Sequence, residues 1–302
     1  MLRCRELEEE QQVSSGEYAP VPFMFDCEAY SKIEGYPTRE SVHALNKVKL
    51  SATRSDEDQC LDIGCGPGGF TRGFLFDYCR PCARLVAVDK DNSMIERARE
   101  ASSHPDITYD LLDIESGDVD AFCVKYGKFQ RVFSFFCFQF VNDNLAAYKN
   151  LAKLLDERGE CVVVSCVNLV IADIWLEVYS MGDWKAYIPD PRVVFSDSFY
   201  FECNTPASDI EAAMRRMIED AGLECITCEA YENEWLYPDA DAIVDFFVSI
   251  FNLDLNIPPH EKAVFRQTWR RMVEHRTTAT PDGRRLNFRF SVAHARLATK
   301  AS

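Results

Sequence analysis

Short apolar runs recur along the first half of the chain, and all but the last are followed by a segment in which apolar residues are spaced three or four apart. The runs cover residues 60–63, 85–88, 107–112, 131–136 and 161–165. Runs of this length are typical of strands buried on both faces, and the intervening spacing is typical of amphipathic helices. Repeated strand–helix units predict a doubly wound, mostly parallel sheet.

The pattern changes towards the C-terminus. A further strand is predicted over residues 223–231, and after it Leu286, Phe288, Phe290 and Val292 alternate with more polar residues. A period of two is typical of an antiparallel strand with one exposed face. We therefore predict an α/β fold built on a seven-stranded, Rossmann-like sheet, mostly parallel, whose last strand is antiparallel.

Residues 167–206 have no clean period and are rich in aromatic side chains. A long segment of this kind is more typical of a lid or cap than of a sheet. We assign residues 1–22 to a disordered tail, because they are polar and end near two prolines. The remainder, 23–302, is predicted to be a single domain, with a core at about 51–166 and 207–302, the cap at about 167–206, and extra helices at about 238–276.

A glycine-rich turn separates the first predicted strand from its helix. Residues 62–68 read Asp-Ile-Gly-Cys-Gly-Pro-Gly. Gly64, Gly66 and Gly68 allow positive φ angles and leave room where a Cβ atom would stand. A strand, turn and helix at the carboxyl edge of a parallel sheet is where open α/β folds bind nucleotide-like ligands.

Three aspartates at successive strand ends narrow the choice of nucleotide. Asp62 lies in the glycine turn, where it would repel a pyrophosphate and attract the cationic amino-acid end of S-adenosylmethionine. Asp89 lies where a ribose-hydroxyl acceptor is expected, and Asp113 can accept from an adenine amino group. The alternative is that these aspartates only form turns. The sequence favours an S-adenosylmethionine site.

The composition and net charge of the chain limit the kinds of partner that it is expected to bind. The 302 residues carry a formal net charge of −16, and the pI is about 4.8. A nucleic-acid or anionic-membrane surface needs clustered Lys and Arg, so we expect neither partner. The first residues are acidic without an apolar core, and no secretory signal is predicted. Thirteen cysteines in such a chain are typical of reduced thiols, so we expect a cytoplasmic protein.

Two Cys-x-x-Cys pairs, Cys79 with Cys82 and Cys225 with Cys228, make a zinc site one interpretation. The second pair falls in a predicted strand, where residues three apart point to opposite faces. We therefore predict structural thiols and no metal.

With these elements placed, the middle two-thirds of the chain resembles the class I S-adenosylmethionine-dependent methyltransferases. The resemblance rests on the turn at residues 62–68, on Val88-Asp89 and on Leu112-Asp113-Ile114. It implies that Asp62 and the three glycines face the methionine part of the cofactor, Asp89 the ribose, and Asp113 with Ile114 the adenine. The other residues assigned to the cofactor are Lys90, Met94 and Phe136.

A narrower resemblance is to the juvenile hormone acid O-methyltransferases of arthropods. It rests on residues 133–143, on Tyr30-x-Lys32 with Arg39 in an N-terminal arm, and on Trp184-x-x-Tyr187 in the cap. It implies a small-molecule substrate, the carboxylate of an apolar acid such as farnesoic acid or its epoxide. The residues given substrate-binding roles by this resemblance are Tyr30, Lys32, Arg39, Trp184 and Tyr187.

The chain departs from that narrower pattern at two places that border the substrate in the family. Pro37 stands where a Gln is usual, and Gln139-Phe140 stands where His-Trp is usual. The identity of the methyl acceptor therefore stays open, as does the oligomeric state.

Methyl transfer to a carboxylate joins an anion and a sulfonium cation, and it gains from an apolar, water-poor cavity and from positioning. The acid is already ionised at neutral pH, so no general base is required. We assign Gln139, a neutral donor, and its neighbour Phe140 to the catalytic site, and we expect Phe246, Phe247 and Phe251 to extend the pocket. The alternative is that these aromatic residues are only core.

Three functions remain open: a carboxyl methyltransferase, which we favour; a methyltransferase fold that uses another acceptor or binds cofactor or a partner without turnover; and an NAD(P) oxidoreductase. The last is supported only by the literal G-x-G-x-x-G string through Gly64, Gly66 and Gly69, and Asp62 argues against it.

Overall fold

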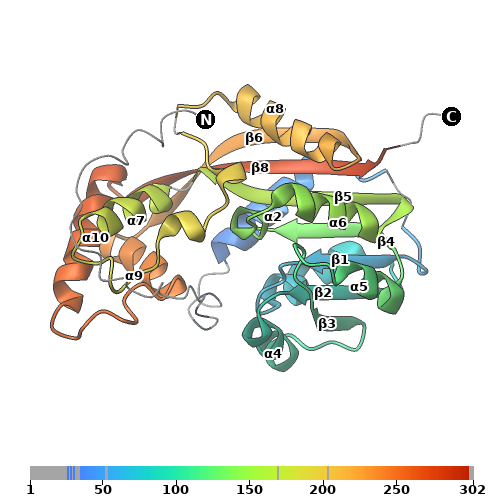
Figure 1. Cartoon of the computed structure of the whole chain (residues 1–302), viewed down its shortest axis with the longest axis horizontal. Helices are drawn as coiled ribbons and strands as arrows, with labels where there is room; N and C mark the ends of the chain where they lie inside the picture. Colours follow the sequence, from blue (N-terminus) through green and yellow to red (C-terminus); the bar gives the residue numbers. More distant parts are fainter. Residues whose placement is uncertain are drawn as a thin grey trace.

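The computed structural model describes residues 26, 28, 30, 35–51, 54–168, 170–202 and 204–298 (Figure 1). The predicted tail at residues 1–22 and the predicted substrate residue Lys32 lie outside these residues. The described strands are β1 (Gln59–Ile63), β2 (Arg84–Asp89), β3 (Ile107–Leu111), β4 (Phe129–Phe135), β5 (Leu155–Asn168), β6 (Leu223–Tyr237), β7 (Thr278–Thr280) and β8 (Gly283–Leu297).

Helices follow most of the strands, as the apolar spacing predicted. The longer ones are α2 (Gly35–Lys47), α4 (Asn92–Ala101), α5 (Val119–Tyr126), α6 (Asn144–Leu154), α7 (Val170–Ser180), α8 (Ala207–Asp220), α9 (Ala240–Ile250) and α10 (Lys262–Arg276). The shorter segments are the π-helical η1 (Thr71–Leu75), the helix α3 (Phe76–Cys79), and the 3₁₀ turns η2 (Phe138–Phe140), η3 (Pro191–Val193) and η4 (Asp197–Phe199).

One sheet organises the described chain, with strand order β3-β2-β1-β4-β5-β8-β6. The first five strands pair in parallel, and β8 runs antiparallel to both β5 and β6. The predicted mostly parallel, Rossmann-like sheet with an antiparallel last strand is confirmed. The three-residue β7, which pairs only with β8, was not predicted, because a hairpin so short leaves no periodic pattern.

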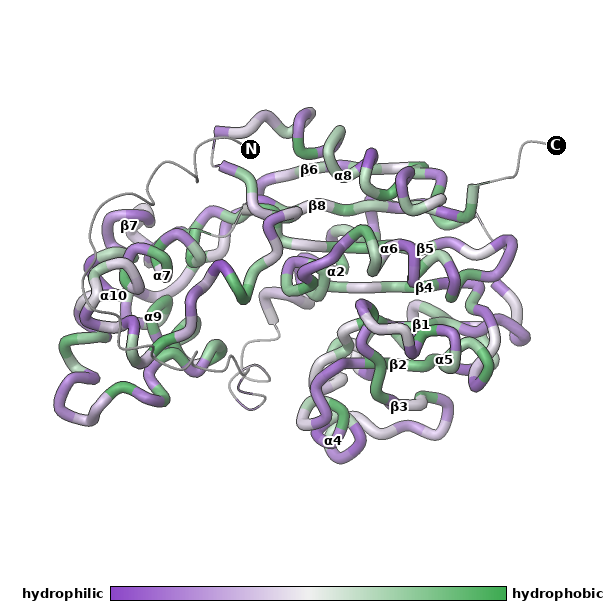
Figure 2. The backbone as a smooth tube through the Cα atoms, viewed as in Figure 1, coloured by the Kyte–Doolittle hydropathy of each residue, from purple (hydrophilic) through white to green (hydrophobic). Residues whose placement is uncertain are grey.

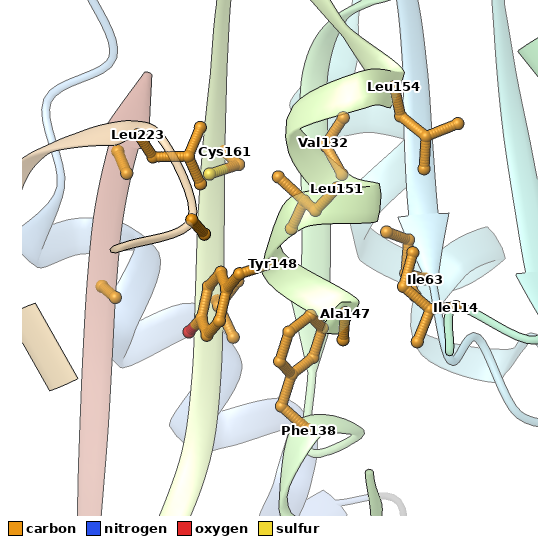
Figure 3. Packing of buried hydrophobic residues seen from close by; sticks show 14 of the residues in the cluster. Ile63, Ile114, Val132, Phe138, Ala147, Tyr148, Leu151, Leu154, Cys161 and Leu223 are labelled. Atoms are coloured by element: carbon orange, nitrogen blue, oxygen red, sulfur yellow. The ribbon is translucent and has the colours of Figure 1, made fainter. Parts of the chain in front are cut away.

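Helices cover both faces of the sheet because successive strand residues point to opposite sides. Leu61 and Ile63 of β1 belong to a core cluster with α5, α6 and α8, whereas Cys60 packs with α2, α3 and α4. Figure 3 shows Tyr148 and Leu151 of α6 on the first of these faces. In Figure 2 β2 carries apolar colouring, as expected for a strand covered on both sides, and helices such as α9 carry it as well.

The helices α7, α9 and α10 lie together at one end of the sheet (Figure 1). They share a core cluster with residues of β6 and β8, including Trp235, Phe288 and Phe290. Both strands are 15 residues long, so they run from the sheet into this group of helices. From here on, the cap means α7, α9 and α10 together with residues 181–202, which pack against them. The cap thus stands on the same strands that complete the sheet.

One prediction about the cysteines was wrong. Cys225 and Cys228 were expected on opposite faces of a regular strand, but a β-bulge shifts the β6–β8 register between Cys225 and Thr227. The extra residue brings the two side chains to the same side, and a hydrogen bond from Cys228 lowers the pKa of Cys225. In the part of the chain that the structure describes, no three His, Cys, Asp or Glu side chains gather in a way that could hold a metal ion.

Candidate active site

A cavity of about 300 Å³ lies at the carboxyl ends of the parallel strands and extends under the cap. Its polar end is lined by Gly64, Gly66, Asp89, Lys90, Asp91, Met94, Asp113 and Ile114. Its apolar end is lined by Cys166, Ile171, Trp235, Phe246, Phe247, Ile250, Phe251, Phe288 and Phe290. A nucleotide-like cofactor and an apolar acceptor can therefore share one continuous space.

The glycine turn is held against the neighbouring strand. Gly64 N and Cys65 N both donate to Val88 O, at 2.7 and 2.9 Å. Gly66 has φ +54°, and among the described residues a Cβ built there would meet only Tyr30 Cε1, at 3.9 Å. Because Gly66 lines the cavity, such a Cβ would occupy cavity space. The turn therefore presents bare backbone to a ligand, which fits the S-adenosyl group.

Asp89 both shapes the turn and faces the cavity. Its Oδ2 accepts from Gly66 N and its Oδ1 from Asp91 N, each at 3.0 Å. Burial raises the pKa of this carboxyl group, and the two N–H donors partly oppose the rise. The position suits the predicted acceptor for ribose hydroxyls.

Asp62 is almost completely buried, with 2 % of the residue exposed. It lines a smaller neighbouring cavity of about 30 Å³, together with Tyr30, Gly64 and Thr71. Thr71 Oγ1 donates to Asp62 Oδ2 at 2.7 Å, yet burial raises the pKa of Asp62 to about 7. An adjacent cation would lower this pKa again, because it favours the ionised form.

The adenine-side prediction is compatible with the geometry. Asp113 and Ile114 line the cavity, and Asp113 Oδ1 accepts from Glu115 N at 3.0 Å. Lys90 and Met94 line the same polar end.

Gly68 lies outside both cavities, although it was grouped with the cofactor residues. A Cβ at Gly68 would stand 2.9 Å from the Tyr109 hydroxyl and 3.0 Å from Ser102 Cβ. Its φ is +80°. Gly68 thus lets the turn pack against α4 and β3, which is a structural requirement, while Gly64 and Gly66 border the cavity.

Phe136 follows β4 in an unusual conformation. It has φ +54°, in the left-handed region that a phenylalanine rarely adopts. Its N–H donates to Val164 O at 2.8 Å, and its ring meets that of Phe290 edge-on at 5.9 Å. Phe136 lines both cavities, so the backbone strain places this ring between them.

Gln139 is 4 % exposed and lines the main cavity. Its Oε1 accepts from Cys166 N at 3.4 Å, and its backbone oxygen accepts from Ser196 N at 2.8 Å. No acceptor for Gln139 Nε2 is found among the described residues, so this amide N–H is available to a ligand. The neighbouring Phe140 lines the cavity and packs against Phe195 and Phe251, with ring centroids 5.4 and 6.4 Å apart.

The structure places one of the predicted substrate residues at the cavities and others away from them. Tyr30 lines both cavities, whereas Arg39 is half-exposed and donates to Glu40 and to Glu234 O, away from either cavity. Trp184 is buried in the cap against Phe265, with ring centroids 5.2 Å apart, and it does not line the cavity.

Tyr187 likewise packs on the cap core and lines neither cavity. Phe246, Phe247 and Phe251 do line the apolar end, as predicted. Sequence reasoning missed Trp235 and gave Phe288 and Phe290 only a sheet role. The alternating aromatic pattern of β8 was the signal, because a strand face rich in large rings can also wall a cavity.

In the described ranges, no helix combines the length and the apolar character that crossing a bilayer demands.

A family model described as "Methyltransferase domain" matches residues 60–159. The chain is 24 % identical to a juvenile hormone acid O-methyltransferase of Bombyx mori, over 78 % of this chain and 82 % of that relative. It is 31 % identical to a trans-aconitate 2-methyltransferase of Afipia carboxidovorans, over 48 % of this chain and 51 % of that relative.

A solved structure of a methyltransferase from Bacillus halodurans has the same fold, with a TM-score of 0.54 at 13 % identity, covering 86 % of this chain and all of that one. The matched domain contains the glycine turn, Asp89 and Asp113, the residues on which the S-adenosylmethionine prediction rested. The nicotinamide alternative has no support from these relatives. Residues 60–159 of the chain are a methyltransferase domain of the S-adenosylmethionine-dependent kind, and the chain has the class I fold.

Proposed function

We propose that this methyltransferase acts on the carboxylate of a small apolar acid. The observation that carries the proposal is the continuous cavity, whose polar end fits the cofactor and whose other end is walled by aromatic and aliphatic side chains. Gln139 and Phe140 line the same cavity. The relative from Bombyx mori is a juvenile hormone acid O-methyltransferase, which supports the same acceptor class.

The residues that would hold S-adenosylmethionine are those of the polar end and the turn. Asp89 would accept from the ribose, Asp113 with Ile114 would border the adenine, and Asp62 would face the cationic amino-acid end. When bound, the cofactor supplies an electrophilic methyl group. The backbone at Gly66 leaves the space that this ligand needs.

The protein would then contribute orientation and exclusion of water. The apolar walls favour the meeting of opposite charges, because separated ions lose more from desolvation than a transition state with dispersed charge. No His, Lys, Arg, Asp or Glu of the described chain lines the apolar end. That suits an acceptor that is already ionised and needs no base.

A methyl-transfer assay with matched acceptors tests the proposal. We expect aliphatic and terpenoid acids of about ten to fifteen carbons to be methylated, and the alcohols and primary amides of the same chains to be inert, because they lack an ionised oxygen. Methylation of those alcohols, or of small dicarboxylic acids in preference to apolar acids, would contradict the proposal.

Gln139→Ala is expected to lower kcat/KM for the acid about ten- to fiftyfold, because one hydrogen bond to a charged group is lost. The dissociation constant of S-adenosylhomocysteine should not change, since the glycine turn and Asp89 are untouched. Asn142→Ala is the matched control, because it removes another amide that lines the cavity. Unchanged kcat/KM in Gln139→Ala would remove Gln139 from the site.

A further inference from the structure

Glu40 is a carboxylate buried in the middle of the arm helix α2, with no exposed surface. Burying such a group is costly unless hydrogen-bond donors surround it. Two of its donors come from β6, almost 200 positions later. Asn233 Nδ2 donates to both carboxylate oxygens at 2.9 Å, and Trp235 Nε1 donates to Oε1 at 3.2 Å.

The neighbouring Arg39 completes the set, donating from Nε and Nη2 to Glu40 Oε1 at 3.2 Å. Glu40 therefore joins the arm helix to the edge strand through a satisfied hydrogen-bond network. Arg39, to which the family resemblance gave a substrate-binding role, donates to this buried carboxylate.

Trp235 connects this network to the cavity. It is 5 % exposed and lines the apolar end. Its ring lies 4.2 Å from that of Phe288 and 6.2 Å from that of Phe246, centroid to centroid. An indole has a single N–H donor, and a buried indole is oriented by the acceptor of that donor. Glu40 is that acceptor, so it determines which way the ring faces.

The same helix makes a second contact with the indole of Trp235. Tyr36, one turn before Glu40 and on the same helix face, stacks on Trp235 with centroids 4.9 Å apart and planes 18° apart. The Tyr36 hydroxyl donates to Leu236 O. Pro37 of the same turn lines the cavity. The arm thus fixes one wall of the cavity through stacking and a hydrogen bond.

We propose that Glu40 is a positioning residue for the acceptor: it orients Trp235 and so sets the shape of the apolar end. The inference rests on the proposed function only in taking that end as the acceptor site. Glu40 does not line the cavity, so its effect passes through Trp235. In Glu40→Gln the size is kept, but an amide NH₂ replaces one acceptor oxygen and faces the NH₂ of Asn233.

The first test needs no ligand. With 5-fluorotryptophan incorporated in the full chain, Trp235→Phe identifies the ¹⁹F resonance of position 235. Glu40→Gln is expected to shift that resonance. Glu229→Gln is the matched control, because Glu229 pairs with Lys47 and joins the same helix to the same strand through partly exposed side chains. It should leave the resonance in place. An unmoved resonance in Glu40→Gln would overturn the proposal.

The second test measures dodecanoate binding by calorimetry with S-adenosylhomocysteine present. Glu40→Gln is expected to raise the dissociation constant of dodecanoate about tenfold and to change that of S-adenosylhomocysteine less than twofold, and Glu229→Gln to change neither. Equal losses of dodecanoate affinity in both variants would reduce Glu40 to a structural clamp. A wild-type protein that binds no dodecanoate would contradict the acceptor class alone, since the resonance shift reports the hold on Trp235 independently.

Discussion

Asp62→Asn should stabilise the protein at pH 8 and weaken its cofactor binding. Burial raises the pKa of Asp62 to about 7 in the folded chain, against about 3.9 for an unperturbed aspartate. The folded state therefore holds a proton that the unfolded state has released between these pH values. By linkage, the free energy of unfolding falls as pH rises through this window, by on the order of 4 kcal/mol in total.

Asparagine carries no charge at any pH, so the variant avoids that loss. We expect its free energy of unfolding to exceed that of the wild type by about 2–4 kcal/mol at pH 8 and to match it near pH 4. Urea denaturation across pH measures the difference. Asp77→Asn is the control, since it removes an exposed carboxylate from the adjoining helix α3. A gain of equal size in Asp77→Asn would show that net charge, and not burial, is responsible.

The same substitution removes the proposed partner of the cationic amino-acid end. The dissociation constant of S-adenosylhomocysteine should rise between about tenfold and a hundredfold, as for the loss of a charge-assisted hydrogen bond. In the wild type near pH 6.5, binding should release a proton as the cation lowers the pKa of Asp62. Calorimetry in buffers of different ionisation enthalpy detects this release. Its persistence in Asp62→Asn would assign the proton to another group.

Gly64→Ala is expected to destabilise the protein by about 3–5 kcal/mol. A Cβ at this position would stand 2.4 Å from Cys137 Cβ and 2.5 Å from Cys137 Sγ, at a φ of +76°. Rotation about χ1 can move Sγ, but Cβ is fixed to the backbone and cannot move without it. Moving Cys137 would also displace the start of η2, which carries Gln139. Chemical denaturation measures the loss.

Gly73→Ala is the matched control for this prediction. Gly73 lies in η1, nine residues further along the same motif, and a Cβ there would meet no atom of the described residues within 4 Å. It should be neutral or stabilising by up to about 1 kcal/mol. A Gly64→Ala variant as stable as Gly73→Ala would contradict the close approach of the turn to Cys137.

Most of the fold could be predicted from local patterns in the sequence. The apolar runs that end at Ile63 and Asp89 are strands because their residues are buried on both faces, and the carboxyl ends of parallel strands meet at one edge. The glycine turn and Asp113 could therefore be placed near one another from the sequence. The contacts that these residues make could not be predicted in the same way. The burial of Asp62, which raises its pKa, depends on packing that no spacing reveals.

The features of the substrate end that could not be predicted from the sequence depend on contacts between residues far apart in the chain. Arg39 and Trp184 were assigned to substrate through short motifs, yet Arg39 donates to Glu234 O and Trp184 packs on Phe265. Trp235 enters the cavity only because β6 pairs with β8 along its full length and the arm helix lies against it. A motif records neighbours in sequence, and these neighbours are 80 to 200 positions apart.

The two long strands have a consequence for how this enzyme can change its acceptor. Tyr237 of β6 pairs with Arg284 of β8, so the two ends of the segment 238–282, which holds α9, α10 and the short strand β7, lie side by side. A segment with adjacent ends can be exchanged without redirecting the rest of the chain, provided that the new segment keeps the buried contacts with the remaining cap, such as that of Phe265 with Trp184. A chimaera that carries a different 238–282 segment would replace the part of the cavity wall that Phe246 and Phe247 form. The residues at the polar end, which would hold the methyl donor, would stay unchanged.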